Sequence, residues 1–269
     1  MKLIVFGGNE TLGGNFDILK RSMDQVLGVE KIYAPHIYDY ALKNQLDTQE
    51  NIAKTLAGFR VKKINQVIHI NFIPFLHHAE ILFEKKFLLN PKAKPYGIPY
   101  DAALLQGYLR KLLRRVGLKD LDKLPVVILP DLMASFDNTE SRYHLRMATF
   151  GYPVILSIPG ITLAPAKPKT FYQLKQSGFD SKHLNYAFHD LIIDHNDPRK
   201  AFVMVGLILQ SISYIKMGKA FCNQKGCSLY NAHLHHELLN IYGSKKHEDN
   251  NFSIPLCGHH HKFFENIPR

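Results

Sequence analysis

The apolar residues of this chain follow strand-like spacing in some stretches and helical spacing in others. Short apolar runs predict β-strands at Leu3–Phe6, Val67–Phe72, Pro125–Leu129 and Pro153–Pro159. The last run is almost continuously apolar, as is typical of a strand buried on both faces of a sheet. Helical spacing predicts amphipathic helices over Asn15–Val26 and Asp101–Val116, the second with Asp101 as its N-cap. Together these elements indicate an α/β fold.

A further helix is predicted from Asp197 to about Met217. Asp197 is a suitable N-cap, and Pro198 fits the first helical position, where its missing N–H is not needed. Apolar side chains occupy almost every side of this segment. A helix that is apolar all round belongs in the interior of a domain.

The composition argues for a globular protein outside the membrane. The chain has 269 residues, of which 46% are apolar and 21% charged, close to the average of soluble globular proteins. No apolar run approaches the roughly eighteen residues that a membrane-spanning helix needs. The apolar start at Met1–Gly8 is too short for a secretory signal and has no small-residue cleavage site behind it. We therefore expect a cytoplasmic protein that does not contact a membrane.

The charge balance bears on possible partners. Lysine and arginine number 34 against 23 for aspartate and glutamate, a formal net charge of +11. Such an excess makes association with polyanions electrostatically favourable. The helix over residues 101–116 gathers Arg110, Lys111, Arg114 and Arg115 on one face, which could follow a nucleic acid backbone. The alternative is a solvated face whose last-turn cations are favoured by the helix dipole. We expect at most weak, sequence-independent binding of polyanions.

All three cysteines lie between residues 222 and 257 and form, with a histidine, two short-spaced pairs. Cys222-x4-Cys227 and Cys257-x2-His260 have the two-plus-two arrangement of structural zinc sites, in which thiolates and imidazoles close a tetrahedron. A disulfide would leave one cysteine over and is not expected in the cytosol. The sequence therefore predicts that Cys222, Cys227, Cys257 and His260 bind one structural Zn²⁺ ion.

The other histidines of this region leave alternatives open. His259, His261 and His233 are alternatives to His260 as the fourth ligand, although the x2 spacing favours His260. His233 and Glu237 are four residues apart and would share a helix face, which suggests a second metal site. Surface or capping histidines are the other interpretation of this segment.

The segment before the cysteines is similar to the signature of archaemetzincins, a family of zinc peptidases related to the metzincins. That signature runs H-E-x-x-H-x-x-G-x-x-H-C, reaches C-x-M after four more residues, and later contains C-x-x-C. Here Gly218, Cys222 and Cys227 fall in register, and the later Cys-x2-His pair stands where the last cysteine pair would. The resemblance covers about residues 100–265. It implies a zincin-like fold with a structural zinc ion, and it places the helix over residues 101–116 on the substrate side.

The departures from that signature concern the catalytic residues. Ser211, Ile215 and Phe221 stand where the family has its three zinc-binding histidines, and Ile212 stands where it has the catalytic glutamate. None of these side chains can hold a catalytic zinc ion or transfer protons for it. The resemblance therefore implies an archaeal branch of the family without the H-E-x-x-H motif. A member of that branch would bind a protein or peptide ligand without cleaving it.

We predict an α/β, zincin-like domain over residues 1–220, with a mixed sheet and a central buried helix. A zinc-binding segment, residues 221–269, would pack on it. Residues 1–95 match no family that we can name.

Two other functions remain open. The first is a metal-dependent hydrolase with a divergent site, either at His195 or at His233, His236 and Glu237. His195 lies between the carboxylates of Asp194 and Asp197, which would raise its pKa, although these residues could instead form a helix cap. The second is a basic nucleic-acid-binding protein.

Overall fold

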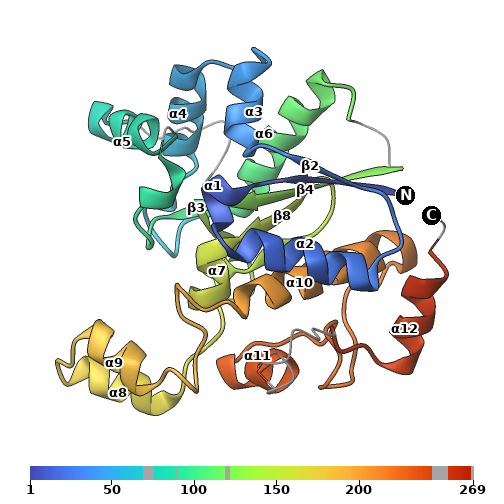
Figure 1. The fold of residues 1–269 in the computed structure, drawn as a ribbon. Coiled ribbons are helices and arrows are strands. Elements are labelled where there is room, and N and C mark those ends of the chain that lie inside the picture. The colour runs from blue at the N-terminus through green and yellow to red at the C-terminus, as the bar shows by residue number, and fades with distance from the viewer. Residues whose placement is uncertain (69–75, 89, 119–121, 244–253, 268–269) are drawn as a thin grey trace. The chain divides into compact units, whose positions relative to one another are not determined.

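A computed structural model describes residues 1–68, 76–88, 90–118, 122–243 and 254–267 (Figure 1). The chain forms two compact units. The first unit comprises residues 1–13 and 29–160, and the second comprises residues 14–28 and 161–269. The division expected from the sequence, between residues 220 and 221, lies within the second unit.

The first unit contains two β-sheets and the helices between their strands. Its elements are β1 (Lys2–Phe6), α1 (Asn9–Leu12), β2 (Lys31–Ala34), α3 (Ile37–Lys43), α4 (Gln49–Gly58), α5 (His78–Leu88), the 3₁₀ turn η1 (Pro91–Ala93), β3 (Pro99–Asp101), α6 (Ala102–Arg115), β4 (Lys123–Leu129), β5 (Leu132–Asp137), β6 (Arg142–Arg146), β7 (Ala148–Thr149) and β8 (Val154–Ser157). Helix α7 (Ile158–Leu163) begins in this unit and ends in the second.

Both sheets of the first unit are mixed. The larger has the order β2-β1-β4-β8-β7, with parallel pairing throughout except at the antiparallel edge strand β7. The smaller has the order β3-β5-β6, in which β3 is parallel and β6 antiparallel to β5. Strand β8 is buried along its whole length, and β4 is buried from Leu124 onward. The predicted α/β class with a mixed sheet is thus confirmed.

The strands of the larger sheet overlap most of the predicted runs. β1, β4 and β8 occupy the runs at residues 3–6, 125–129 and 153–159, although the last run turns into α7 at Ile158. The strand predicted at Val67–Phe72 falls largely on residues 69–75, outside the described residues.

Helix α6 has the cap and the apolar face that its sequence predicts. The carboxylate of Asp101 accepts hydrogen bonds from the backbone N–H groups of Ala103 (2.9 Å) and Leu104 (3.0 Å). On the basic face, the guanidinium of Arg110 donates to the carbonyl of Tyr152 (2.7 Å). One member of the basic face, Arg110, is therefore hydrogen-bonded within the first unit.

The second unit is built mainly of helices. They are α2 (Asn15–Val26), the end of α7, α8 (Lys169–Gln176), α9 (Ser181–Ala187), α10 (Lys200–Met217), α11 (His235–Tyr242) and α12 (Gly258–Glu265). Helix α2 has the predicted bounds and buries Phe16, Leu19 and Met23.

Helix α10 starts later than its sequence suggests. The carboxylate of Asp197 accepts hydrogen bonds from the backbone N–H (2.8 Å) and the guanidinium (2.9 Å) of Arg199, so it stabilises the turn before the helix. The helix begins at Lys200, and it ends at Gly218 in the left-handed conformation (φ 72°). By length and apolar composition α10 could cross a membrane, contrary to the sequence expectation. However, 78% of it is buried inside the protein, as in a core helix.

A network of buried charges holds the first unit together. Glu84 accepts hydrogen bonds from Arg60 Nε (2.6 Å), Lys94 Nζ (2.9 Å) and the Tyr100 hydroxyl (2.6 Å). Lys94 also donates to Asp131. Burial opposes the positive charge, but the carboxylate of Asp131 and the other partners raise the pKa of Lys94 above its usual value. The ammonium therefore stays charged between two buried carboxylates.

We predict that Lys94→Met will lower the free energy of unfolding by about 3–5 kcal/mol, because two carboxylates then remain buried without their shared cation. Urea denaturation measures the effect. The control is Lys62→Met, which removes a more exposed ion pair with Glu80 and should cost less than about 1 kcal/mol. Equal effects of the two substitutions would show that the buried network is not the stabilising feature.

Candidate metal centre

Four side chains from two distant segments meet in the second unit. The sulfur atoms of Cys222, Cys227 and Cys257 and one imidazole nitrogen of His260 all lie within 4.8 Å of one another. Cys222 Sγ is 3.9 Å from Cys257 Sγ, and His260 Nδ1 is 3.6 Å from Cys227 Sγ and 3.0 Å from Cys257 Sγ. These are the four residues that the sequence singles out as a zinc site.

The spacing of the four atoms fits a tetrahedral ion. A zinc ion bonds to thiolate sulfur at about 2.3 Å, so two sulfurs of one tetrahedron lie about 3.8 Å apart. The distance between Cys222 Sγ and Cys257 Sγ is 3.9 Å, close to this value. The donor set of three thiols and one imidazole is one that structural zinc sites use. The cluster can therefore hold a metal ion of the size and preference of zinc.

The first pair of cysteines is held by a tight loop. The N–H of Gln224 points at Cys222 Sγ (3.4 Å), and the N–H of Cys227 donates to the Gln224 carbonyl (3.0 Å). The N–H of Cys222 donates to the Leu229 carbonyl (2.8 Å), which fixes the base of the loop. Four residues between the cysteines are enough for this turn, and it presents both sulfurs to the same point.

The second pair lies at the start of α12. Cys257 is the N-cap residue, and His260 follows in the first turn with only 6% of its surface exposed. The neighbouring histidines are exposed, and the ring of His261 pairs with Glu265 (3.2 Å). His233 is also exposed and lies outside the cluster. The fold thus brings His260, rather than the three alternatives, to the cysteines.

The electrostatics of the cluster call for a cation. Burial raises the pKa of the Cys227 thiol to about 12, because a thiolate there has little water around it. Burial also acts on Cys257, but hydrogen bonds from the backbone N–H of His260 and from the neighbouring thiols lower its pKa. Burial, and then His259, lowers the pKa of His260, which favours the neutral imidazole that binds metals. A bound dication would supply the charge that lets the thiols ionise.

His195 does not have the environment of an acid–base residue. Its Nδ1 lies 3.3 Å from the hydroxyl of Thr162. Burial, followed by the nearby charge of Lys200, lowers the pKa of His195, whereas the sequence suggested that it would be raised. That expectation was wrong because burial and the charge of Lys200 outweigh the carboxylate of Asp194, which does act to raise the pKa, and because Asp197 pairs with Arg199.

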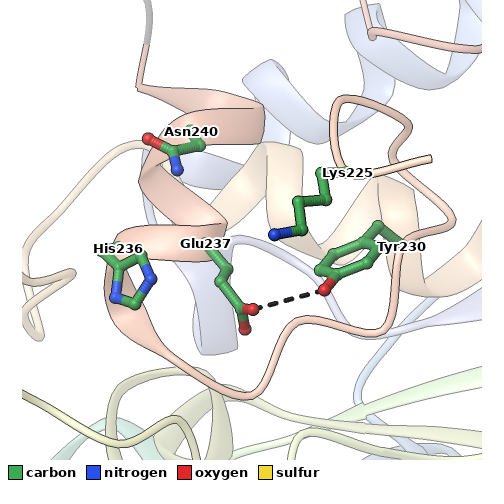
Figure 2. Close-up of a pocket in the computed structure, with 5 residues that line it drawn as sticks. All are labelled: Lys225, Tyr230, His236, Glu237 and Asn240. Atoms are coloured by element: carbon green, nitrogen blue, oxygen red, sulfur yellow. Dashed lines mark hydrogen bonds between the residues drawn. The ribbon is translucent and has the colours of Figure 1, made fainter. Parts of the chain in front are cut away.

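The histidine-rich segment forms the start of α11 and one wall of a small cavity. The cavity is lined by Lys225, Tyr230, His236, Glu237 and Asn240 (Figure 2). Its volume is about 60 Å³, room for a few water molecules rather than for a peptide side chain of any size.

Glu237 acts in this segment as a helix cap. Its carboxylate accepts hydrogen bonds from the backbone N–H groups of His233 (2.8 Å) and Leu234 (3.0 Å) and from the Tyr230 hydroxyl (3.3 Å). His236, Glu237 and Asn240 have the spacing of an H-E-x-x-H motif in which an amide replaces the second histidine. An amide is not among the ligands that zinc prefers. The hydrogen bonds of Glu237 are therefore those of a helix cap rather than of a metal ligand.

His235, which the sequence did not single out, is fully buried. Its Nδ1 accepts the N–H of Ile193 (3.0 Å), and its Nε2 lies 3.3 Å from the carbonyl of Thr162. A neutral ring with its proton on Nε2 satisfies both contacts. Burial and the charge of Lys167 accordingly lower the pKa of His235 to about 4. The sequence feature that could have identified His235 as buried is its helical spacing with the buried residues Leu238, Ile241 and Tyr242.

The sequence model of a probable metallopeptidase family (DUF6775) matches residues 23–267. No curated protein and no solved structure matches the chain.

We predict that His260→Ala and Cys222→Ser will release zinc and lower the melting temperature by on the order of 10 °C, because the binding energy of a structural ion is folding energy. His259→Ala and His261→Ala are matched controls and should retain the ion. Metal analysis and thermal unfolding provide the measurements. Zinc loss in a control with retention in His260→Ala would show that another histidine is the ligand.

A second prediction concerns pH. The unfolded chain protonates His235 near its ordinary pKa of about 6.5, whereas the folded chain does so only near 4, so acid favours unfolding. The stability due to this residue is complete above about pH 6.5 and is lost as the pH falls towards 4. We expect a loss of about 2 kcal/mol between pH 7.5 and pH 5. His235→Asn, which keeps the metal cluster, should lack this part of the pH dependence. Identical pH profiles for the two proteins would refute the assignment.

Proposed function

The chain belongs to a probable metallopeptidase family, and on this premise we propose that it is an archaemetzincin-like member that binds one structural zinc ion and no catalytic one. In this proposal it recognises a protein or peptide without cleaving it.

The observation that carries the proposal is the closure of the metal cluster. Within the described residues, one group of three or more metal-ligating side chains is close enough to share an ion, and it is the Cys3His cluster. A catalytic zinc ion needs three protein ligands and an open position for water. Here all four positions of the tetrahedron are filled by Cys222, Cys227, Cys257 and His260. Such a site stabilises a fold but does not activate water.

The helix in register with the peptidase signature also supports the proposal. Gly218 ends α10 in the left-handed conformation, where the signature has its turn glycine. The Ser211 hydroxyl donates to the Leu207 carbonyl of the same helix (2.7 Å), and Ile212 is fully buried. Phe221 is 47% exposed. None of these positions offers an imidazole or a carboxylate, so neither zinc binding nor proton transfer can take place there.

The mixed sheet and the buried helix agree with a zincin-like arrangement. The sheet β2-β1-β4-β8-β7 has a single antiparallel edge strand, and α10 is buried from Lys200 to Ser213. These features are what the resemblance implies for the fold. They support the archaemetzincin-like assignment alongside the cysteine spacing.

The test is to incubate the purified zinc-loaded protein with a mixture of peptides and with denatured proteins, with and without 1,10-phenanthroline. Mass spectrometry then detects new amino termini. We predict no chelator-sensitive cleavage and one zinc ion per chain. Reproducible cleavage that the chelator abolishes would contradict the proposal. In that case Glu237→Gln would show whether the cavity over α11 is responsible.

A further inference from the structure

Helices α8 and α9 form a hairpin with a small core of its own (Figure 1, yellow). Phe171, Leu184 and Ile192 are buried together, and the ring of Phe171 packs edge-on against Phe188 with centroids 5.6 Å apart. The turn between the helices passes through Gly178, whose φ of +90° suits a residue without a side chain. Together with Leu174, these apolar residues form the core of the hairpin, and the side chains described next are not part of it.

The hairpin also exposes several large apolar side chains. The exposed fraction is 45% for Tyr172, 54% for Phe179, 83% for Tyr186 and 49% for Leu191. Single exposed apolar residues are normal on a protein surface, but a group within twenty residues of one hairpin suggests an interaction site. We call this group, with the lysines described next, the hairpin face.

Each helix of the hairpin places at least one lysine three or four residues from a tyrosine. On α8, Tyr172 has Lys169 and Lys175 three residues away on either side. On α9, Tyr186 lies four residues after Lys182. Residues three or four apart share one side of a helix, so each tyrosine lies on the same side of its helix as its lysines. The ring of Tyr186 also stacks on His189, with centroids 6.2 Å apart and an interplanar angle of 24°.

The charge of the hairpin is positive on balance. Its cations include Lys169, Lys175 and Lys182. Asp180 caps α9 by accepting the N–H of Lys182 (2.9 Å), and Asp190 lies 3.2 Å from His189. Residues 167–191 carry the four lysines Lys167, Lys169, Lys175 and Lys182 against the two carboxylates Asp180 and Asp190, so an anionic ligand would meet an excess of positive charge.

We propose that the hairpin face binds single-stranded nucleic acid, with Tyr172 and Tyr186 stacking on bases and the lysines contacting phosphates. Rings interleaved with cations are the surface that unpaired nucleotides recognise without sequence preference. The hydroxyl of Tyr172 already accepts the N–H of Lys167 (3.1 Å), which fixes the ring. A duplex would not offer free base faces to these rings.

The chemistry of the face favours nucleic acid over a lipid surface. Three of the four exposed apolar residues are aromatic, and Leu191 is the aliphatic one. Membrane-surface helices bury a broad stripe of leucine and other apolar residues into the acyl region, which neither helix has. The net charge of +11 suits a polyanion in either case.

The test uses the zinc-loaded full chain and fluorescently labelled oligo-dT and oligo-U of about 12 nucleotides, within the length that such surfaces cover. Anisotropy at low salt should show binding. The slope of log K against log salt should be about −2, as expected for three lysine–phosphate contacts on a single strand. Tyr172→Ala combined with Tyr186→Ala should weaken binding by about tenfold or more, and phenylalanine at both positions should restore it.

The control removes equal charge elsewhere. Lys169→Gln, Lys175→Gln and Lys182→Gln together should abolish most of the binding, whereas Lys63→Gln, Lys111→Gln and Arg114→Gln together should preserve it. Circular dichroism checks that the variants fold. Binding that is equal in both triple variants, or absent in the unmodified protein, would overturn the proposal. So would binding to phosphatidylserine vesicles without binding to the oligonucleotides. Neither result bears on the zinc site or on peptidase activity.

Discussion

Three thiols and one imidazole must converge on one point for the second unit to hold its shape. Cys222 and Cys257 are 35 residues apart in the chain, and their sulfurs lie 3.9 Å apart. Ionisation of the buried Cys227 thiol without a cation is unfavourable, as its raised pKa shows. A zinc ion bound to all four side chains would link the cysteine loop, residues 222–227, to α12 and would thereby stabilise the fold of this segment.

The backbone that follows the cysteine loop also contacts helix α10. The side-chain amide of Gln210 on α10 donates to the carbonyls of Ser228 (3.3 Å) and Tyr230 (3.2 Å), both beside the cysteine loop. A Cβ atom at Gly206 would overlap the hydroxyl of Tyr242 and press on the loop carbonyl at Ser228. Glycine at this point lets α10, α11 and the loop pack closely. These contacts thus connect the metal cluster to helix α10.

Much of this could be predicted from the sequence, because the determining interactions are local. The spacing of Cys222 and Cys227 encodes a tight loop, and Asp101 encodes the cap of α6 at the expected position. The sequence misled where a side-chain pairing or burial decides the outcome. Asp197 pairs with Arg199 in the turn before α10, so the helix starts at Lys200. Burial and the charge of Lys200 lower the pKa of His195 and outweigh the carboxylate of Asp194. The exposure of Tyr186 depends on which face the hairpin core uses, and the sequence pattern does not reveal that.

X-ray absorption at the zinc K-edge of the purified protein tests the central claim most directly, because it reports both the number and the kind of atoms around the ion. The account predicts a single four-coordinate environment with three sulfurs at about 2.3 Å and one nitrogen at about 2.0 Å. Oxygen ligands from water or carboxylate, or a second zinc environment with mainly nitrogen and oxygen neighbours, would contradict it. The first would mean that the cluster is open, and the second would mean that a catalytic ion is bound elsewhere in the chain.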